Sequence, residues 1–111
     1  QKVASPRPNA PGPNEIRVRA VTIDVEGTVR RLRGAALVET TEAVLRADEI
    51  DYDEKTGLAE ARGNVQYESF TSGEKLFAER GEYNVNEETG KFYGLRGSAP
   101  AKIEARPGVL T

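Results

Sequence analysis

The sequence predicts an all-β domain that is built from repeated strand–turn–strand units. Apolar and polar residues alternate along most of the chain, which is typical of strands with one buried face. Residues 45–65, LRADEIDYDEKTGLAEARGNV, form one complete unit, in which two alternating runs flank the polar residues 53–57. The last of these, Gly57, can adopt the positive φ angle that closes a short hairpin. These features together predict antiparallel strands joined by tight turns.

A second copy of the unit occupies residues 76–99, LFAERGEYNVNEETGKFYGLRGSA. Three positions recur after 31 residues: Leu45, Ala47 and Tyr52 return as Leu76, Ala78 and Tyr83. Arg-Gly pairs end three successive units, at positions 33–34, 62–63 and 96–97. A period of about thirty residues is typical of stacked supersecondary units, each of which needs its neighbours to bury its apolar face.

The folded domain is expected to span residues 15–105. Residues 1–14 contain four of the six prolines and no apolar periodicity, so we expect a disordered, proline-rich linker there. Residues 106–111, RPGVLT, are expected to form a flexible tail. A chain of 111 residues is long enough for one domain with a modest core.

The first strands are expected between residues 16 and 39. Alternation runs through residues 16–19 and resumes with the opposite parity at Val21, Ile23 and Val25, which are expected to be half-buried. A turn at Gly27 then leads into a longer strand. The following segment, TTEAVLR, has some helical character, but its position between strand-like units favours a strand or a loop.

The inward face changes in the middle of each unit. Leu45 and Ala47 share one parity, whereas Ile50 and Tyr52 share the other, so the change falls near residues 48–49. The second unit changes at the equivalent place, near residues 80–81. A switch repeated in two units predicts a bulge or corner, where each strand bends from one layer into a facing one. Strands that all bend in this way build a rolled sandwich.

Composition excludes several classes of protein. Hydrophobic residues make up 37% of the chain and there is no Trp or Met, so the core is expected to be thin. A net charge of −2 with interspersed signs does not provide the basic stripe that nucleic-acid binding needs. The absence of cysteine and histidine excludes disulfides, thiolate metal sites and the commonest general base. The sequence has neither a signal peptide nor an apolar run near the ~18–20 residues that span a bilayer.

Two short motifs have ordinary explanations. Residues 72–75 match the Ser-x-x-Lys pattern of serine acyltransferases, but a glycine and strand-like surroundings favour a loop over the helical turn that this chemistry needs. Asp51 and Asp53 faintly resemble a calcium loop, yet Lys55 stands where another oxygen donor is required. We therefore expect a protein that is not an enzyme and has no catalytic residues, metal site or cofactor.

The inner surface is the most informative feature of the predicted fold. A thin core that includes small residues such as Ala59 and Ala61 could leave an apolar groove between the two layers, and such a groove suits acyl chains. The alternative is a closed sandwich in which the same residues pack against one another. Periodicity alone favours the closed sandwich.

The two units resemble the repeats of the OstA-like family, the lipopolysaccharide-transport proteins of the bacterial cell envelope. The shared elements are a Leu/Phe-x-Ala-Asp/Glu run, a Tyr before an acidic Thr-Gly turn, and the Arg-Gly-Asn-Val close at residues 62–65. The resemblance covers residues 16–105. The second unit departs from it, because Ser98 and Ala99 stand in place of the Asn-Val pair.

The resemblance implies a rolled antiparallel β-jelly roll, or β-taco, whose interior holds lipid acyl chains. It implies a non-enzymatic periplasmic protein that needs no cofactor, with or without a membrane anchor. Its partners would be lipopolysaccharide and other transport proteins of the same fold, joined head to tail through edge strands into homo- or hetero-oligomers. The alternative function is a structural β-repeat protein that self-assembles through its edges without a lipid.

The residues of inward parity are the predicted lipid-binding residues: Leu45, Ala47, Ile50, Tyr52, Ala59, Ala61, Val65, Tyr67, Leu76, Ala78, Tyr83, Val85 and Leu95. A further hypothesis places arginines at the rim against lipid phosphates: Arg31, Arg33, Arg46, Arg62 and Arg96. The resemblance leaves open three kinds of protein: the free bridge protein, an inner-membrane-anchored component, and the amino-terminal domain of the outer-membrane protein.

Overall fold

The computed structural model describes residues 11–12 and 15–98. The expected tail and most of the expected linker lie outside these residues, so both remain predictions, as do the domain limits. The described residues form these strands: β1 (Arg17–Arg19), β2 (Thr22–Glu26), β3 (Val29–Glu39), β4 (Ala43–Asp53), β5 (Leu58–Ser69), β6 (Lys75–Asn84), β7 (Thr89–Tyr93) and β8 (Gly97–Ser98). They contain no helix, so the all-β prediction is confirmed.

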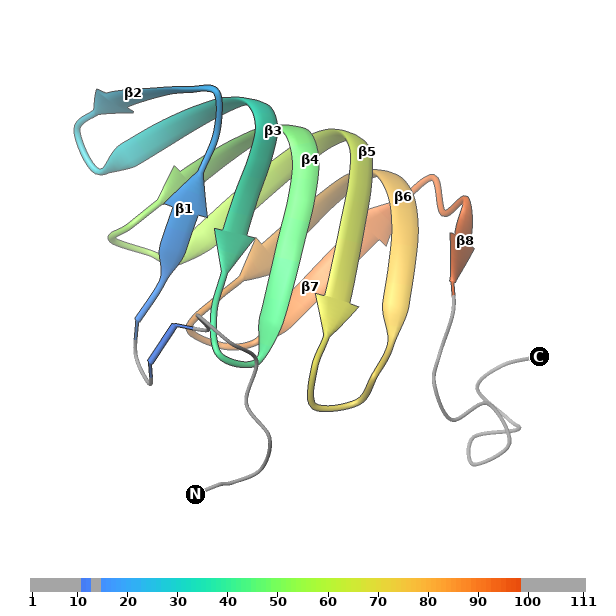
Figure 1. The fold of residues 1–111 in the computed structure, drawn as a ribbon. Helices are drawn as coiled ribbons and strands as arrows, with labels where there is room; N and C mark the ends of the chain where they lie inside the picture. Colours follow the sequence, from blue (N-terminus) through green and yellow to red (C-terminus); the bar gives the residue numbers. More distant parts are fainter. Residues whose placement is uncertain (1–10, 13–14, 99–111) are drawn as a thin grey trace.

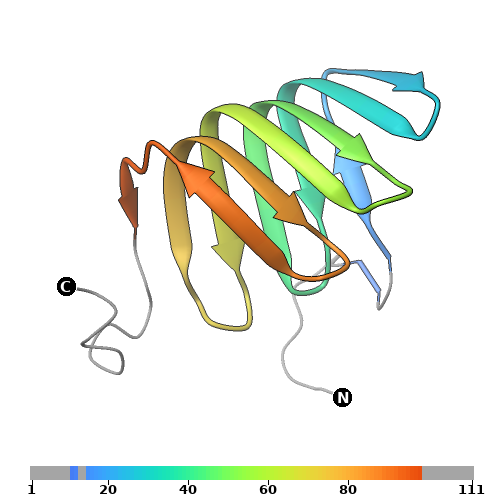
Figure 2. The same ribbon diagram turned by 180° about the vertical axis from the view of Figure 1, so that it is seen from behind.

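All the strands belong to one antiparallel sheet that is folded onto itself (Figures 1 and 2). The strand order is β1-β3-β4-β5-β6-β7, with β2 beside β3 and β8 beside β6. One layer contains β2, β7 and the residues of the long strands that pair between them: 29–33, 49–53, 58–62 and 80–84. The second layer contains β1, β8 and the other halves of the long strands. The rolled antiparallel architecture predicted from the parity switches is therefore confirmed.

The bend between the two layers follows a line of β-bulges, which we call the fold line. The register shifts between Arg33 and Ala36 on β3, between Arg46 and Glu49 on β4, and between Arg62 and Val65 on β5. The shift on β4 lies where the parity switch predicted it. At the fold line β3 and β5 each carry one more residue than the strands that face them. The inward parity is therefore kept along β3 and β5, whereas it reverses along β4 and β6.

The bulges explain two of the three Arg-Gly pairs. Gly34 and Gly63 have φ angles of 85° and 82°, in the left-handed region that favours glycine. The next residue in each bulge, Ala35 or Asn64, also has a positive φ, of 48° or 50°. Gly97 lies in β8 and is not among the positive-φ residues. The motif therefore has a conformational role in the first two units only.

Replacing Gly63 by alanine is expected to lower the free energy of unfolding by about 1–3 kcal/mol. A Cβ at this position would lie 2.7 Å from Oδ2 of Asp48, and the φ angle disfavours any L side chain. Urea denaturation measures the effect. Gly97→Ala is the matched control, because its Cβ would meet nothing closer than Phe77 at 3.9 Å. Equal losses in the two variants would contradict the role assigned to the bulge.

The core lies between the two layers and is made mainly of aliphatic residues. Its largest fully buried side chains are Leu32, Leu45, Ile50 and Val65. Alanines occupy many of the remaining inner positions, which allows the layers to approach closely: Ala36, Ala43, Ala47, Ala59, Ala61 and Ala78. The predicted thin core is therefore present.

The prediction for the first strands is wrong in one respect. Val21, Ile23 and Val25 were expected to be half-buried, but their exposed fractions are 77%, 41% and 64%. The physical reason is that β2 pairs with β3 alone and lies at the edge of the sheet. Alternation shows which side chains share a face, but not whether another strand covers them.

Candidate functional site

The inner face of the first layer is formed by two rows of side chains that run across the strands. Backbone register places opposite residues on the same face, so each row can be followed from one edge of the sheet to the other. The row nearer the fold line is Ile23, Leu32, Ile50, Ala61, Gly81 and Phe92. The row nearer the open side is Val25, Arg30, Tyr52, Ala59, Tyr83 and Gly90. Apart from Arg30, an apolar surface thus crosses the whole layer.

The structure brings most of the predicted lining residues together in one core. Ten of them belong to the buried cluster: Leu45, Ala47, Ile50, Tyr52, Ala59, Ala61, Val65, Ala78, Tyr83 and Val85. Tyr67 packs against this cluster, and Leu76 is half-buried opposite Tyr67 in the same row. These positions establish a shared apolar interior, and lipid contact remains a proposal.

The inward placement predicted for Leu95 is wrong. Its side chain is 61% exposed, and it follows the end of β7 at Tyr93. Gly94, with a φ angle of 67°, turns the chain between β7 and β8, so the parity counted along β7 does not continue to Leu95. In the sequence, Gly94 is the signal that the strand ends before Leu95.

Several interior residues were left out of the predicted lining. The core also contains Leu32, Ala36, Val38 and Ala43, and it is extended by Ile16, Val18, Ala20 and Phe92. The alternation in residues 16–39 carries the signal for those that lie on β1 and β3. The predicted lining does not include them because it rests on the repeat units rather than on the whole sheet.

The interior is filled by its own side chains in this structure. Leu32, Ile50, Ala59 and Ala61 all have an exposed fraction of 0%. An acyl chain can therefore occupy this space only if the two layers move apart. We call the side opposite the fold line the open side. Parting the layers there breaks the fewest backbone hydrogen bonds.

Aromatic contacts close part of the open side. The rings of Tyr67 and Tyr83, which come from opposite layers, lie with their centroids 5.2 Å apart, and Phe92 lies at the same distance from Tyr67. Burial and the neighbouring Tyr67 hydroxyl raise the pKa of Tyr83 far above its ordinary value. Every backbone–backbone hydrogen bond given for the described residues joins sheet neighbours or closes a turn. Within residues 15–98, side-chain contacts therefore hold the layers together at this side.

Two hollows with acidic residues lie along the open side. One, of about 310 Å³, has Ile16, Thr41 and Val85 in its lining, and the other, of about 240 Å³, includes Tyr67 and Tyr83. Both are lined by Glu42 and Glu88. The open side is thus more polar than the interior.

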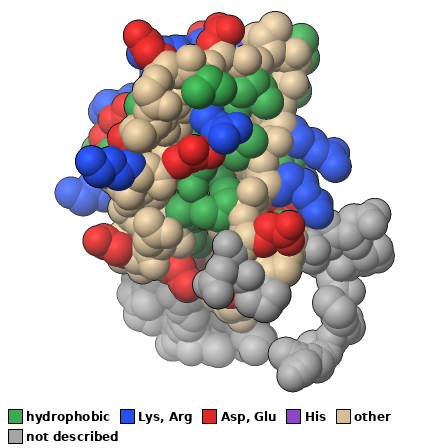
Figure 3. Space-filling model, turned by 90° about the vertical axis from the view of Figure 1, so that its left-hand side faces the viewer, with side chains coloured by type: hydrophobic (Ala, Val, Ile, Leu, Met, Phe, Trp, Pro, Cys, Tyr) green, Lys and Arg blue, Asp and Glu red, His purple; other side chains and the backbone are tan. Residues whose placement is uncertain are grey.

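The apolar interior is also exposed at the two ends of the roll. Figure 3 shows hydrophobic side chains gathered in the middle of the end nearest β1 and β2, crossed by basic and acidic side chains. Ile23 and Val25 contribute to this end, and an ion pair joins Arg30 to Glu54. At the other end, Phe92 is half-buried and Tyr93 is 38% exposed. Among the described strands, those at both ends pair on one side only.

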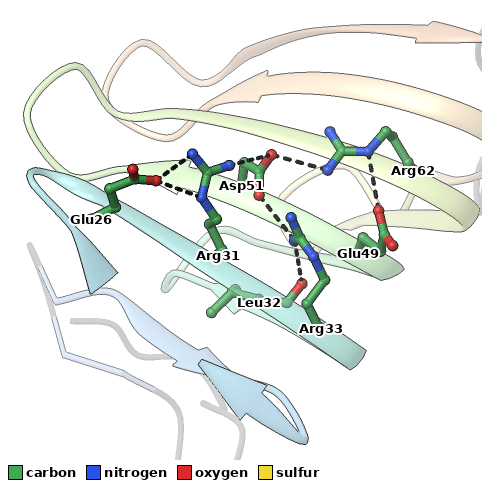
Figure 4. Close-up of polar contacts among 7 residues, drawn as sticks. All are labelled: Glu26, Arg31, Leu32, Arg33, Glu49, Asp51 and Arg62. Carbon is green, nitrogen blue, oxygen red and sulfur yellow. Dashed lines mark hydrogen bonds and ion pairs between the residues drawn. The ribbon is translucent and has the colours of Figure 1, made fainter. Parts of the chain in front are cut away.

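Three of the proposed rim arginines lie on the outward face instead, in a network of ion pairs around Asp51 (Figure 4). Arg33 and Arg62 each lie 3.0 Å from Asp51, and Arg31 lies 3.7 Å away. Partial burial opposes ionisation of this carboxyl, but hydrogen bonds from Arg62 and Arg33 outweigh that effect and lower its pKa. Arg31 and Arg62 are also paired with Glu26 and Glu49. These arginines neutralise carboxylates on the outer surface.

Replacing Asp51 by asparagine is expected to lower the free energy of unfolding at pH 7 by about 1 kcal/mol, since partly exposed ion pairs stabilise modestly. The folded-state pKa of Asp51 lies below its ordinary value of 3.8. Its contribution is therefore present above that value and is lost as the pH falls through the folded-state pKa. Urea unfolding at several pH values should show the difference between the two proteins shrinking below about pH 4.

Glu60→Gln is the control for this experiment, because Glu60 lies beside Asp51 on β5 and makes none of the ion pairs given for the described residues. Its unfolding curve should follow the wild type at every pH. A pH-independent difference for Asp51→Asn would show that the carboxylate does not act through these ion pairs.

The described residues include no group of three acidic, cysteine or histidine side chains that could hold a metal ion. They also contain no helix of the length and apolarity needed to cross a membrane.

Comparison with solved structures finds 6 similar chains. No family model matches the sequence, and no curated protein matches it either. The chain is similar to the crystal structure of LptH from Pseudomonas aeruginosa, the LptA-homologous periplasmic component of the conserved lipopolysaccharide transport device. The sequence identity is 12%, the similarity covers 74% of this chain and 84% of that one, and the TM-score is 0.39. Because identity and TM-score are both low, no residue of LptH assigns a role to a residue here.

Proposed function

We propose that this chain binds the acyl portion of lipopolysaccharide between its two β-layers and passes it to domains of the same fold in the periplasm. The observation that carries the proposal is a single apolar interior that crosses the sheet and reaches both ends of the roll. The resemblance of the repeat units to lipopolysaccharide-transport proteins supports the choice of lipid.

Acyl chains enter, on this proposal, from the open side. Parting the layers there separates the rings of Tyr67 and Tyr83 and leaves the backbone pairing of the sheet intact. The fold line acts as the hinge, because its bulges already interrupt the regular register of three long strands. The core alanines, Ala59 and Ala61 among them, then provide a flat, apolar wall for a chain of methylenes.

The affinity expected of such a site suits transfer. Each buried methylene contributes ~0.8 kcal/mol, so a few methylenes give useful binding. Parting the layers costs part of this gain, because the apolar contacts of the closed core are lost first. The net affinity is therefore moderate, and the lipid can leave for the next domain.

The two ends of the roll provide the route between domains. β1 and β2 at one end and β7 and β8 at the other can each pair with an edge of a similar domain, which extends the sheet through main-chain hydrogen bonds. Such pairing also covers Ile23, Val25 and Tyr93 and joins the interiors of neighbouring domains. The expected assembly is a head-to-tail row of the same or related chains.

A second candidate function is a structural β-repeat protein that assembles through these edges and carries no lipid. The filled interior favours it, because the core is complete without a ligand. The two candidate functions share the edge contacts and differ only in whether the interior binds a lipid.

Tyrosine fluorescence provides the test. The chain has no Trp, and three of its four tyrosines, Tyr52, Tyr67 and Tyr83, face the interior. Purified lipopolysaccharide should change the emission saturably, whereas polysaccharide stripped of its acyl chains should not. Tyr83→Phe should reduce the change and Tyr93→Phe, at an exposed position, should not. Equal responses to both ligands, or none to lipopolysaccharide, would favour the structural protein.

A further inference from the structure

Two of the nine arginines in the described residues differ from the others because no partner is given for their side chains. Seven of the nine in the described residues have a partner: Arg17, Arg30, Arg31, Arg33 and Arg62 form ion pairs, Arg80 lies over the ring of Tyr93, and Arg96 donates to Asn64. Arg19 and Arg46 are both exposed, and neither has such a partner among the described residues. A guanidinium that is left free while seven others are paired is available to a ligand.

The sheet places these two arginines on the same outward surface. Leu37 of β3 lies opposite Arg19 of β1 on one side and opposite Arg46 of β4 on the other. The three side chains therefore form a row on the outer face of the second layer, with an apolar residue between two cations. Strand spacing puts the backbones of the outer two about 10 Å apart, within reach of one ligand for side chains of this length.

The row borders a hollow of about 370 Å³ at the fold line. Arg19, Leu37 and Arg46 form one part of its lining, and the bulge residues Ala35 and Asn64 form another. Both bulge residues have positive φ angles, which determine where they lie in the lining. The hollow is therefore a consequence of the bend in the sheet.

One carboxylate, that of Asp48, also lines the hollow. Its Oδ2 accepts a hydrogen bond of 3.0 Å from the Asn64 amide, which holds it against the β5 bulge. It is not ion-paired with either arginine among the described residues. The lining therefore carries two free positive charges against one negative charge that is already hydrogen-bonded.

We propose that this hollow binds a phosphate or carboxylate group that is attached to an apolar chain. Arg19 and Arg46 would donate charge-assisted hydrogen bonds to the anionic group, and guanidinium groups suit both anions because their donors form a planar fork. Leu37 and Ala35 would contact the first part of the apolar chain. The two arginines lie on the outer face of the sheet, and the core residues Ala36 and Ala47 also line the hollow at the fold line. The proposed binding of the anionic group does not depend on lipid between the layers.

Dodecyl phosphate, used below its micelle concentration, is the probe for this site. Titrated into the full chain, it should shift the backbone amide resonances of Ala35, Leu37 and Asn64 in a saturable manner. Arg46→Gln and Arg19→Gln should each weaken binding roughly tenfold, the effect of one hydrogen bond to a charged group. Arg31→Gln makes the same charge change on the other layer and should leave binding unchanged.

Three results would overturn the proposal. Shifts confined to interior residues such as Ile50 and Ala61 would place the alkyl chain between the layers, in support of the proposed function alone. Equal weakening by Arg31→Gln would show a general charge effect. Equal binding of inorganic phosphate or of dodecyl maltoside would show that the hollow does not require both the anion and the apolar chain.

Discussion

Aspartate in place of Ile50 is expected to prevent the domain from folding at neutral pH. Ile50 has an exposed fraction of 0% and lies in the middle of an inner row, between Leu32 and Ala61. The substitution removes a large apolar side chain and buries a charge without a partner, which costs more than about 4 kcal/mol. A domain of this size has a total stability of about 5–15 kcal/mol. Because the core here is thin, a loss of this size is expected to be enough to unfold it.

Circular dichroism and urea denaturation measure this loss. Leu95→Asp is the informative control, because sequence parity places Leu95 with Ile50 whereas the structure leaves it 61% exposed. That variant should be as stable as the wild type to within about 0.5 kcal/mol. Equal destabilisation of the two variants would mean that Leu95 belongs to the core. Because Ile50→Asp unfolds the domain with or without a ligand, it tests the core and does not separate the two candidate functions.

Cross-linking the two layers at the open side is expected to block lipid uptake. The native chain has no cysteine, so Tyr67→Cys combined with Tyr83→Cys creates one reactive pair at the place where the two rings now meet. A short bis-maleimide that joins these cysteines holds the layers at the closed separation. Since the closed interior has no room for an acyl chain, lipopolysaccharide binding should fall by at least roughly tenfold.

The control is the same double variant capped with N-ethylmaleimide, which modifies both cysteines without joining them. It should retain binding, because the layers remain free to part. The folded state of both samples is checked by circular dichroism. Undiminished binding by the cross-linked protein would show that acyl chains do not enter between the layers at this side.

Much of the fold is predictable from local patterns. The turn at residues 53–57 is present, and Gly57 has a φ angle of 84° with its N–H donated to the carbonyl of Asp53. The change in parity after Ala47 marks the fold line, where β4 bends between strands that each carry one extra residue. Each of these features depends only on neighbouring residues, which the sequence displays directly.

Features that depend on distant parts of the sheet were not predictable. Ile23 alternates like a buried strand residue but is 41% exposed, because its exposure depends on which strand ends the sheet. Alternation does not show that Arg33 and Arg62, which both lie opposite Glu49, form ion pairs with Asp51. The separation of the two layers, which decides between a groove and a filled core, is likewise set by packing rather than by periodicity.

Photocrosslinking in cells that make lipopolysaccharide tests the central claim most directly. A photoreactive phenylalanine analogue is placed at Tyr67 or Val85, both of which belong to or pack against the core, and at the exposed, outward Glu60. Lipid entry between the layers predicts lipopolysaccharide adducts at the two inward positions and none at Glu60. Folded protein that forms no adduct at Tyr67 or Val85 would contradict lipid carriage and leave edge-to-edge assembly as the function.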